Sequence, residues 1–206
     1  MQTEVKRRAD IARALRLTWV SLLYNLVETG VGVGAGLAAG SVALLGFGLD
    51  SVVESSSATV ILWRLRAERS GAHTSEEAER KAIRLIAGAF FVIAAYVGAQ
   101  SLFDLATGAR PEESLVGLVL AAVSVVVMPV LARQKRRVAG DLGSKAVEAD
   151  STQTTLCAYI SVAVLAGLAA NSLFGWWWAD AVAGLVIAGL AVEEGRELWL
   201  TRDFCC

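Results

Sequence analysis

Two acidic side chains lie four residues apart in the segment GFGLDSVVESSSA, residues 46–58, which has apolar residues on both sides. Positions i and i+4 of a helix share one face, so Asp50 and Glu54 would be neighbours there. Carboxylates inside a membrane segment are costly unless they are paired, protonated or hydrated. Two of them on one face can together bind a cation. The alternative is helix packing, in which these acids and the four serines of the segment hydrogen-bond neighbouring helices.

A second polar face occurs in EADSTQTTLCAYIS, residues 148–161. Asp150, Gln153 and Cys157 stand at i, i+3 and i+7, which again places them on one face of a helix. Counted from the outer ends of their segments, Cys157 and Glu54 lie at similar depth, because a helix rises about 1.5 Å per residue. The second face is therefore the natural partner of the first. In the alternative interpretation, Cys157 is a small buried thiol of the hydrophobic core.

Further polar residues interrupt the apolar segments. Asn25 and Glu28 lie in the first segment, and with Asp150 we expect them to be accessory groups of the same cavity or part of a proton path. Asp180 opens the last segment, where it could cap that helix or anchor the short turn before it. His73, the only histidine, lies in a polar stretch that we expect to be solvated.

The elements that must position these residues are membrane helices. Of the 206 residues, 55% are hydrophobic and the mean hydropathy is +0.55, which is too apolar for a soluble domain of this length. Continuous apolar runs of about 20 residues predict helices, since a spanning segment must satisfy its backbone hydrogen bonds internally. Six such runs predict an all-α membrane protein with six transmembrane helices: 14–37, 41–63, 83–106, 114–132, 151–171 and 176–199.

The basic residues predict how these helices are oriented. Eighteen of the 19 Lys and Arg residues fall on one side of the membrane, and only Arg110 falls on the other. They include Lys135, which the predicted spans place in the connection between the fourth and fifth helices. By the positive-inside rule that side, with both termini, is cytoplasmic. We expect an integral, multi-pass protein of the cytoplasmic (inner) membrane if the source is bacterial. Cys205 and Cys206, adjacent at the C-terminus, make no disulfide framework with Cys157.

Two stretches carry a resemblance to a known family. AGSVALLGFGLDSVVESSSATVILWRLR, residues 39–66, resembles the second helix of cation diffusion facilitators, and residues 145–189 resemble their fifth and sixth helices. The resemblance implies export of divalent metals, commonly zinc, in exchange for protons, usually by a homodimer. It also implies a transport site made by two residues four apart on helix two and two residues four apart on helix five.

Carried onto this sequence, the resemblance assigns the metal site to Asp50 and Glu54 on one helix and to Gln153 and Cys157 on the other. The second pair departs from the family, which usually has histidine and aspartate at these positions. Glutamine is a neutral ligand that cannot carry a proton. A cysteine thiolate favours zinc and softer ions over manganese or magnesium.

We therefore expect residues 1–206 to form a single transmembrane domain, similar to a short family member without the cytoplasmic C-terminal domain, and no soluble domain. The expected function is transport of a divalent cation, zinc before others, by metal/proton antiport out of the cytoplasm. Metal ions, membrane lipid and a second copy of the chain are the expected partners, with no nucleic acid and no permanent cofactor. The alternative is a non-transporting membrane partner that keeps a degenerate metal site and modulates another protein. No motif of an enzyme rises above chance, so catalysis is not expected.

Overall fold

The chain folds into long α-helices. The structure is a computed structural model that describes residues 2–70 and 76–201, and these residues contain six helices and no strand. The helices are α1 (Gln2–Ala39), α2 (Val42–Ser70), α3 (Glu76–Thr107), α4 (Leu115–Leu142), α5 (Lys145–Phe174) and α6 (Trp178–Thr201). The predicted all-α class and the number of helices are confirmed. His73, Cys205 and Cys206 lie outside the described residues.

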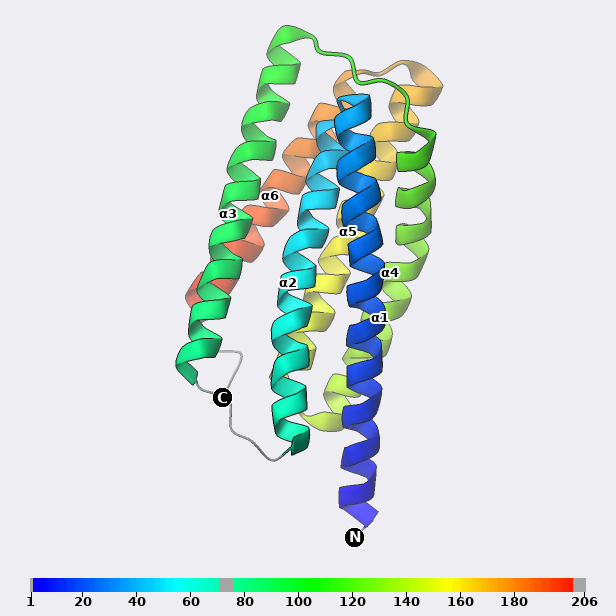
Figure 1. The fold of residues 1–206 in the computed structure, drawn as a ribbon. Helices are drawn as coiled ribbons and strands as arrows, with labels where there is room; N and C mark the ends of the chain where they lie inside the picture. The colour runs from blue at the N-terminus through cyan, green and yellow to red at the C-terminus, as the bar shows by residue number, and fades with distance from the viewer. Residues whose placement is uncertain (1, 71–75, 202–206) are drawn as a thin grey trace.

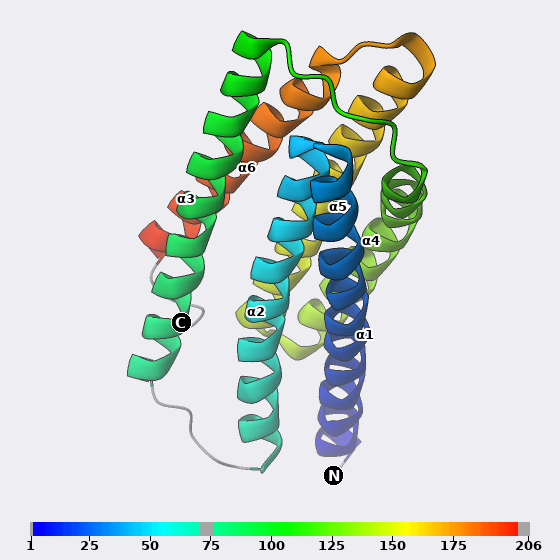
Figure 2. The same cartoon turned by 45° about the horizontal axis from the view of Figure 1, so that its top comes forward.

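The helices pack mainly as three pairs, α1 with α2, α4 with α5, and α3 with α6 (Figure 1). α2 is the most central element, because it contacts α1, α3, α5 and α6. After a turn of 45° the α3–α6 pair stands to one side of the other four helices (Figure 2). The helix that carries both acids of the 46–58 segment therefore lies where the two parts of the bundle meet.

Four helices contain stretches that are long and apolar enough to cross a bilayer by length and composition, within the residues that the structure describes. They are Lys6–Ala39, Arg84–Thr107, Leu115–Leu142 and Val147–Phe174. The two remaining helices, α2 and α6, contain buried acids that lower their apolar character. In a bundle such groups face the protein interior instead of lipid. The chain is an integral, multi-pass membrane protein.

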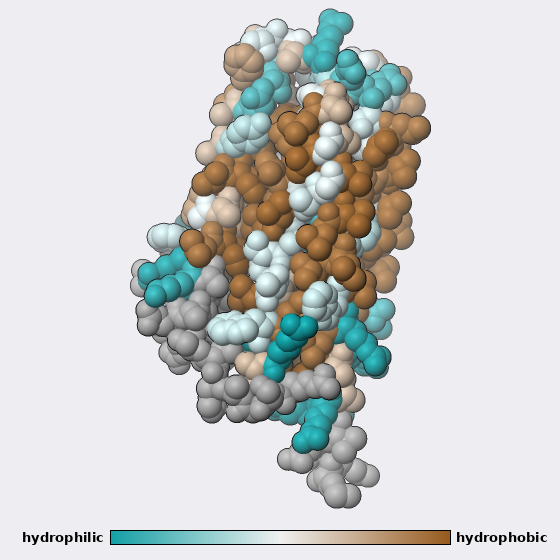
Figure 3. Space-filling model, in the orientation of Figure 1, coloured by the Kyte–Doolittle hydropathy of each residue, from teal (hydrophilic) through white to brown (hydrophobic). Residues whose placement is uncertain are grey.

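The outer surface of the bundle suits contact with lipid. Figure 3 shows apolar side chains across the middle of one face and hydrophilic side chains toward its two ends. Large apolar residues are exposed on the outside of the bundle, for example Leu23 with 59% and Val126 with 66% of its surface. An exposed apolar surface of this extent is typical of contact with a membrane or another protein.

Small residues bring α1 and α2 close together. A Cβ atom on Gly48 would lie 2.6 Å from the backbone nitrogen of Val33, and one on Gly36 would lie 2.7 Å from that of Leu45. No larger residue fits at either position without separating the helices. Small residues at helix contacts allow such close approach inside a membrane.

Asp180 acts on a different helix from the one that its position predicts. Its carboxylate accepts a hydrogen bond from the Ser41 hydroxyl and another, at 3.4 Å, from the backbone N–H of Ala43. It therefore caps the beginning of α2 and ties the α1–α2 turn to the start of α6. The sequence predicted that Asp180 would cap its own helix or anchor the turn before it, but its carboxylate instead contacts the start of α2.

Candidate cation site

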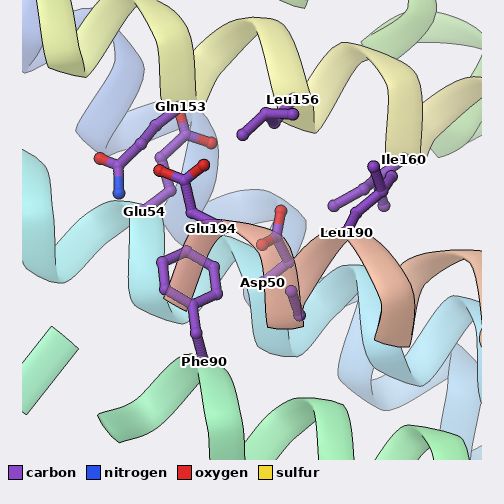
Figure 4. A pocket seen from close by; sticks show the side chains of 9 residues that line it. Asp50, Glu54, Phe90, Gln153, Leu156, Ile160, Leu190 and Glu194 are labelled. Carbon is purple, nitrogen blue, oxygen red and sulfur yellow. The ribbon is translucent and has the colours of Figure 1, made fainter. Parts of the chain in front are cut away.

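A cavity inside the bundle contains both acids of the 46–58 segment. It lies between α2, α3, α5 and α6, and Figure 4 shows the side chains that line it. Its polar residues are Asp50 and Glu54 from α2, Gln153 from α5 and Glu194 from α6. Its apolar residues are Phe90, Leu156, Ile160, Leu190 and Ala191.

The two sequence-predicted helix faces meet at this cavity. Asp50 and Glu54 project together because they stand one helical turn apart on α2. Gln153 faces them from α5, a helix that contacts α2 directly. Three of the four residues assigned to the metal site therefore line one space.

Two of these side chains have buried polar atoms without a hydrogen-bond partner. The Oε2 atom of Glu54 and both amide atoms of Gln153 are in this state, and the two residues are only 3% and 6% exposed. Leaving a buried polar group unpaired costs about 1–3 kcal/mol, and more for a charged one. Such groups call for an explanation, and a ligand that fills the cavity provides one.

The cavity is narrow. Its volume is about 10 Å³. By the same measure of volume, a single water molecule needs roughly 10–15 Å³. A cation with a complete hydration shell does not fit. A cation that enters must exchange most of its water for oxygen atoms of the protein.

Cys157, the fourth predicted ligand, lies beside the cavity and does not line it. Its thiol is near the carboxyl groups of Asp50 and Glu54. It is 1% exposed and belongs to the hydrophobic core that includes Phe47 and Ile187. Both interpretations of this thiol, ligand and core residue, are compatible with that position.

The described residues include no group of three His, Cys, Asp or Glu side chains that is close enough together to hold a metal ion. The cavity therefore has separated ligand candidates and not a completed coordination sphere.

The second oxygen of Glu54 is held by a buried hydrogen-bond chain. The Thr154 hydroxyl lies 2.8 Å from Oε1 of Glu54 and donates to it. The same hydroxyl accepts a hydrogen bond from Nζ of Lys135 at 2.9 Å, and this ammonium also lies 2.9 Å from the carboxylate of Asp150. One oxygen of Glu54 is thereby fixed while the other remains available to the cavity.

The position of Lys135 corrects the sequence-based assignment. The apolar pattern ends the fourth span at residue 132, but α4 continues to Leu142 and places Lys135 inside the helix, fully buried. No proline occurs between residue 132 and Gly143, and Gly143 ends α4 in the left-handed conformation with a φ of 62°. Burial of the ammonium is possible because Asp150 on α5 neutralises it. Asp150 is thus an ion-pair partner and does not line the cavity.

Glu28 and Asn25 also lie away from the cavity lining. The Glu28 carboxylate accepts hydrogen bonds from Ser51 on α2 and Ser124 on α4, and Ser124 is in turn 2.8 Å from the Tyr24 hydroxyl. Asn25 is fully buried, and neither of its side-chain polar atoms has a partner. Glu28 therefore connects α1, α2 and α4 through hydrogen bonds. It does not line the cavity, where the sequence had placed it.

A sequence model of the cation efflux transmembrane domain matches residues 18–200 of this chain. The chain belongs to the cation efflux family. It is 27% identical over 200 residues to the cation-efflux pump FieF of Shewanella oneidensis, an alignment that covers 93% of this chain and 62% of FieF. It is 29% identical over 187 residues to an uncharacterized transporter of Synechocystis sp., covering 87% of this chain and 59% of that protein. The chain thus spans about 60% of the length of these curated relatives.

Three residues around this candidate site were not found from the sequence. Glu194 stands at the end of an apolar run and beside three other charged residues, Glu193, Arg196 and Glu197, so it looks like part of the solvated flank. Lys135 lies in the basic run RQKRR, where no signal indicates which residue turns inward. Thr154 could have been recognised, because it is four residues from Asp150 and next to Gln153.

Proposed function

We propose that this chain transports a divalent metal cation across the membrane, with zinc as the preferred ion. One observation carries the proposal. The buried, unpartnered Oε2 of Glu54 and the amide of Gln153 share a cavity with Asp50 in the centre of a membrane bundle. Ionisable residues inside a membrane protein mark ion pathways more often than they serve packing.

Each ligand has a distinct part in this proposal. Asp50 and Glu54 supply two negative charges that balance a divalent ion, and Gln153 supplies a neutral carbonyl oxygen. Cys157, beside both acids, is the proposed soft ligand that favours zinc over harder ions. Thr154 and Lys135 keep Glu54 oriented toward the ion.

Protons are the proposed counter-ions. Asp50 and Glu54 bind either protons or a cation. On one side of the membrane the metal leaves and protons replace it, and on the other side the protons leave and metal replaces them, which couples the two flows. Gln153 takes no part in the exchange because its amide does not titrate. Export from the cytoplasm and a homodimeric assembly complete the proposal, both on the basis of the family resemblance.

Zinc flux into vesicles that contain the purified protein tests transport directly. We expect uptake that increases when a proton gradient is imposed and that is absent from vesicles holding the Asp50→Asn, Glu54→Gln double variant. A matched vesicle without protein measures leakage. Flux that is equal in the double variant and in the original protein would contradict the proposed site.

One observation favours the second candidate, a non-transporting membrane partner. No three acidic, thiol or imidazole side chains of the described residues converge on a metal position. A protein of that kind would bind zinc and carry none across the membrane. Binding measured by calorimetry on the same preparation, alongside the flux, separates the two functions.

A further inference from the structure

We infer that Glu194 on α6 is a ligand of the transported divalent cation, so that the site draws on three helices. The inference rests on the proposed function and names an additional donor for it. The resemblance places ligands on the second and fifth helices alone, and Glu194 is outside that set. Nothing in the sequence pattern separates it from its charged neighbours.

Glu194 lies where it can share an ion with the two acids of α2. Glu194 lines the cavity together with Asp50, Glu54 and Gln153, and only 6% of its surface is exposed. Figure 4 shows its carboxylate directed toward Gln153 and Glu54. The neighbouring Glu193 is exposed, so α6 turns one of two adjacent acids into the bundle.

Close packing of α6 against α3 supports this orientation of Glu194. Gly195, the next residue, lies against α3, where an added Cβ would be 3.1 Å from the Cβ of Phe90. Phe90 also lines the cavity. A Cβ at position 195 would be crowded by α3, so the close contact keeps this part of α6, which carries Glu194, against α3 beside the cavity.

The cavity needs a further donor if the residues that line it are to surround a metal ion. Gln153 is neutral, and the thiol of Cys157 does not line the cavity. The cavity lining of α2 and α5 therefore provides two carboxylates and one amide oxygen. Glu194 adds a carboxylate oxygen to these three donors, so the lining offers the four that a tetrahedral ion needs even before the thiol of Cys157 beside it is counted. The amide of Gln153 and Oε2 of Glu54 have no protein partner, so they are free to bind the same ion.

The test measures binding of zinc and of manganese to the purified full chain by calorimetry in detergent. Glu194→Gln keeps the shape and hydrogen-bonding capacity of the side chain and removes its charge. We expect about ten-fold weaker binding or more, since loss even of groups that only support a ligand weakens metal sites by about 10–100-fold. Glu193→Gln, the matched change at the exposed neighbour, should leave the affinity unchanged.

The outcomes separate this inference from the proposed function. If the original protein binds metal, the Asp50→Asn, Glu54→Gln double variant does not, and Glu194→Gln binds as well as the original, then Glu194 is not a ligand although the site stands. If the double variant binds with unchanged affinity, the proposed site itself is wrong. Should Glu194→Gln fail to fold, Glu194→Asp shortens the reach of the carboxylate by one methylene. An unchanged affinity in that variant also overturns the inference.

Discussion

The ammonium of Lys135 on α4 lies 2.9 Å from the carboxylate of Asp150 on α5, and both side chains are completely buried. The pair joins two helices next to the cation site, and through Thr154 it reaches Glu54. A buried ion pair adds little net stability compared with apolar residues of the same size, but removal of one partner leaves an uncompensated charge. The pair therefore fixes how α4 and α5 lie next to each other, and loss of one partner destabilises the protein.

We expect Lys135→Met to lower the free energy of unfolding by about 3–5 kcal/mol, because Asp150 then stays buried without its partner. Adding Asp150→Leu should restore much of this loss. Arg136→Met, at the exposed neighbouring position, is the matched control and should change little. Thermal unfolding in detergent measures all three. If Lys135→Met is as stable as the original protein, the pair is not buried.

Thr154→Val removes the hydroxyl between Lys135 and Glu54 while it keeps the shape of the side chain. We expect weaker zinc binding, because Oε1 of Glu54 loses the donor that orients its carboxylate, and a loss of about 1–3 kcal/mol in stability from unpaired polar groups. Thr155→Val is the control, since that hydroxyl bonds only to the backbone of its own helix at Ser151. Equal zinc affinity in both variants would show that Thr154 does not position the Glu54 carboxylate.

Orientation is open to a labelling test. The basic residues predict that the α3–α4 connection is outside and the α4–α5 connection is cytoplasmic. In a chain with Cys205 and Cys206 changed to Ser, a membrane-impermeant thiol reagent should label Arg110→Cys in intact cells and should reach Arg136→Cys only after lysis. Both replaced positions are exposed. The reverse pattern would invert the topology and the proposed direction of transport.

The sequence allowed prediction of those parts of the site that helical periodicity brings together. Asp50 and Glu54 share a face at any orientation of α2, and Gln153 lies on the matching face of α5, so all three were predicted. Glu194 was missed because its inward direction depends on how α6 packs along α3, a contact between two helices that are separated by 70 residues of chain. Lys135 was missed for a similar reason, since only Asp150 across the helix pair distinguishes it from the neighbouring basic residues.

The length of α4 shows the same limit on a local scale. Hydropathy marks where lipid contact ends, and it placed the end of the span at residue 132. The helix itself ends ten residues later at Leu142, where Gly143 accepts a left-handed conformation. Hydropathy therefore predicted the membrane segments and not the helical extensions that carry Lys135 into the interior.

Cys157 decides between softer and harder ions in the proposed site. We expect Cys157→Asp to lower the preference for zinc and cadmium relative to manganese, because a carboxylate oxygen replaces sulfur beside Asp50 and Glu54. Cys157→Ala separates loss of sulfur from gain of oxygen and should lower cadmium affinity without raising that for manganese. Competition binding of the three ions measures the ranking. An unchanged ranking in both variants would make Cys157 a core residue only.

Metal binding and proton release should be linked at Asp50 and Glu54. A metal ion and protons compete for the same carboxylate oxygens, so addition of zinc to the purified protein should release protons, and zinc affinity should rise as the pH rises. The Asp50→Asn, Glu54→Gln double variant keeps the size of both side chains and cannot exchange protons there, so it should lose zinc binding and proton release together. Glu113→Gln, an exposed position in the α3–α4 connection, serves as the matched control.

Proton release is followed with a pH indicator in weak buffer, and zinc binding by calorimetry at several pH values. Loss of binding with unchanged proton release would mean that the protons come from another acid, and Glu28, fully buried between Ser51 and Ser124, would be the first to examine. Retention of both by the double variant would exclude Asp50 and Glu54 as the coupled site. Because each result points to a different set of carboxylates, the experiment locates the exchange as well as testing it.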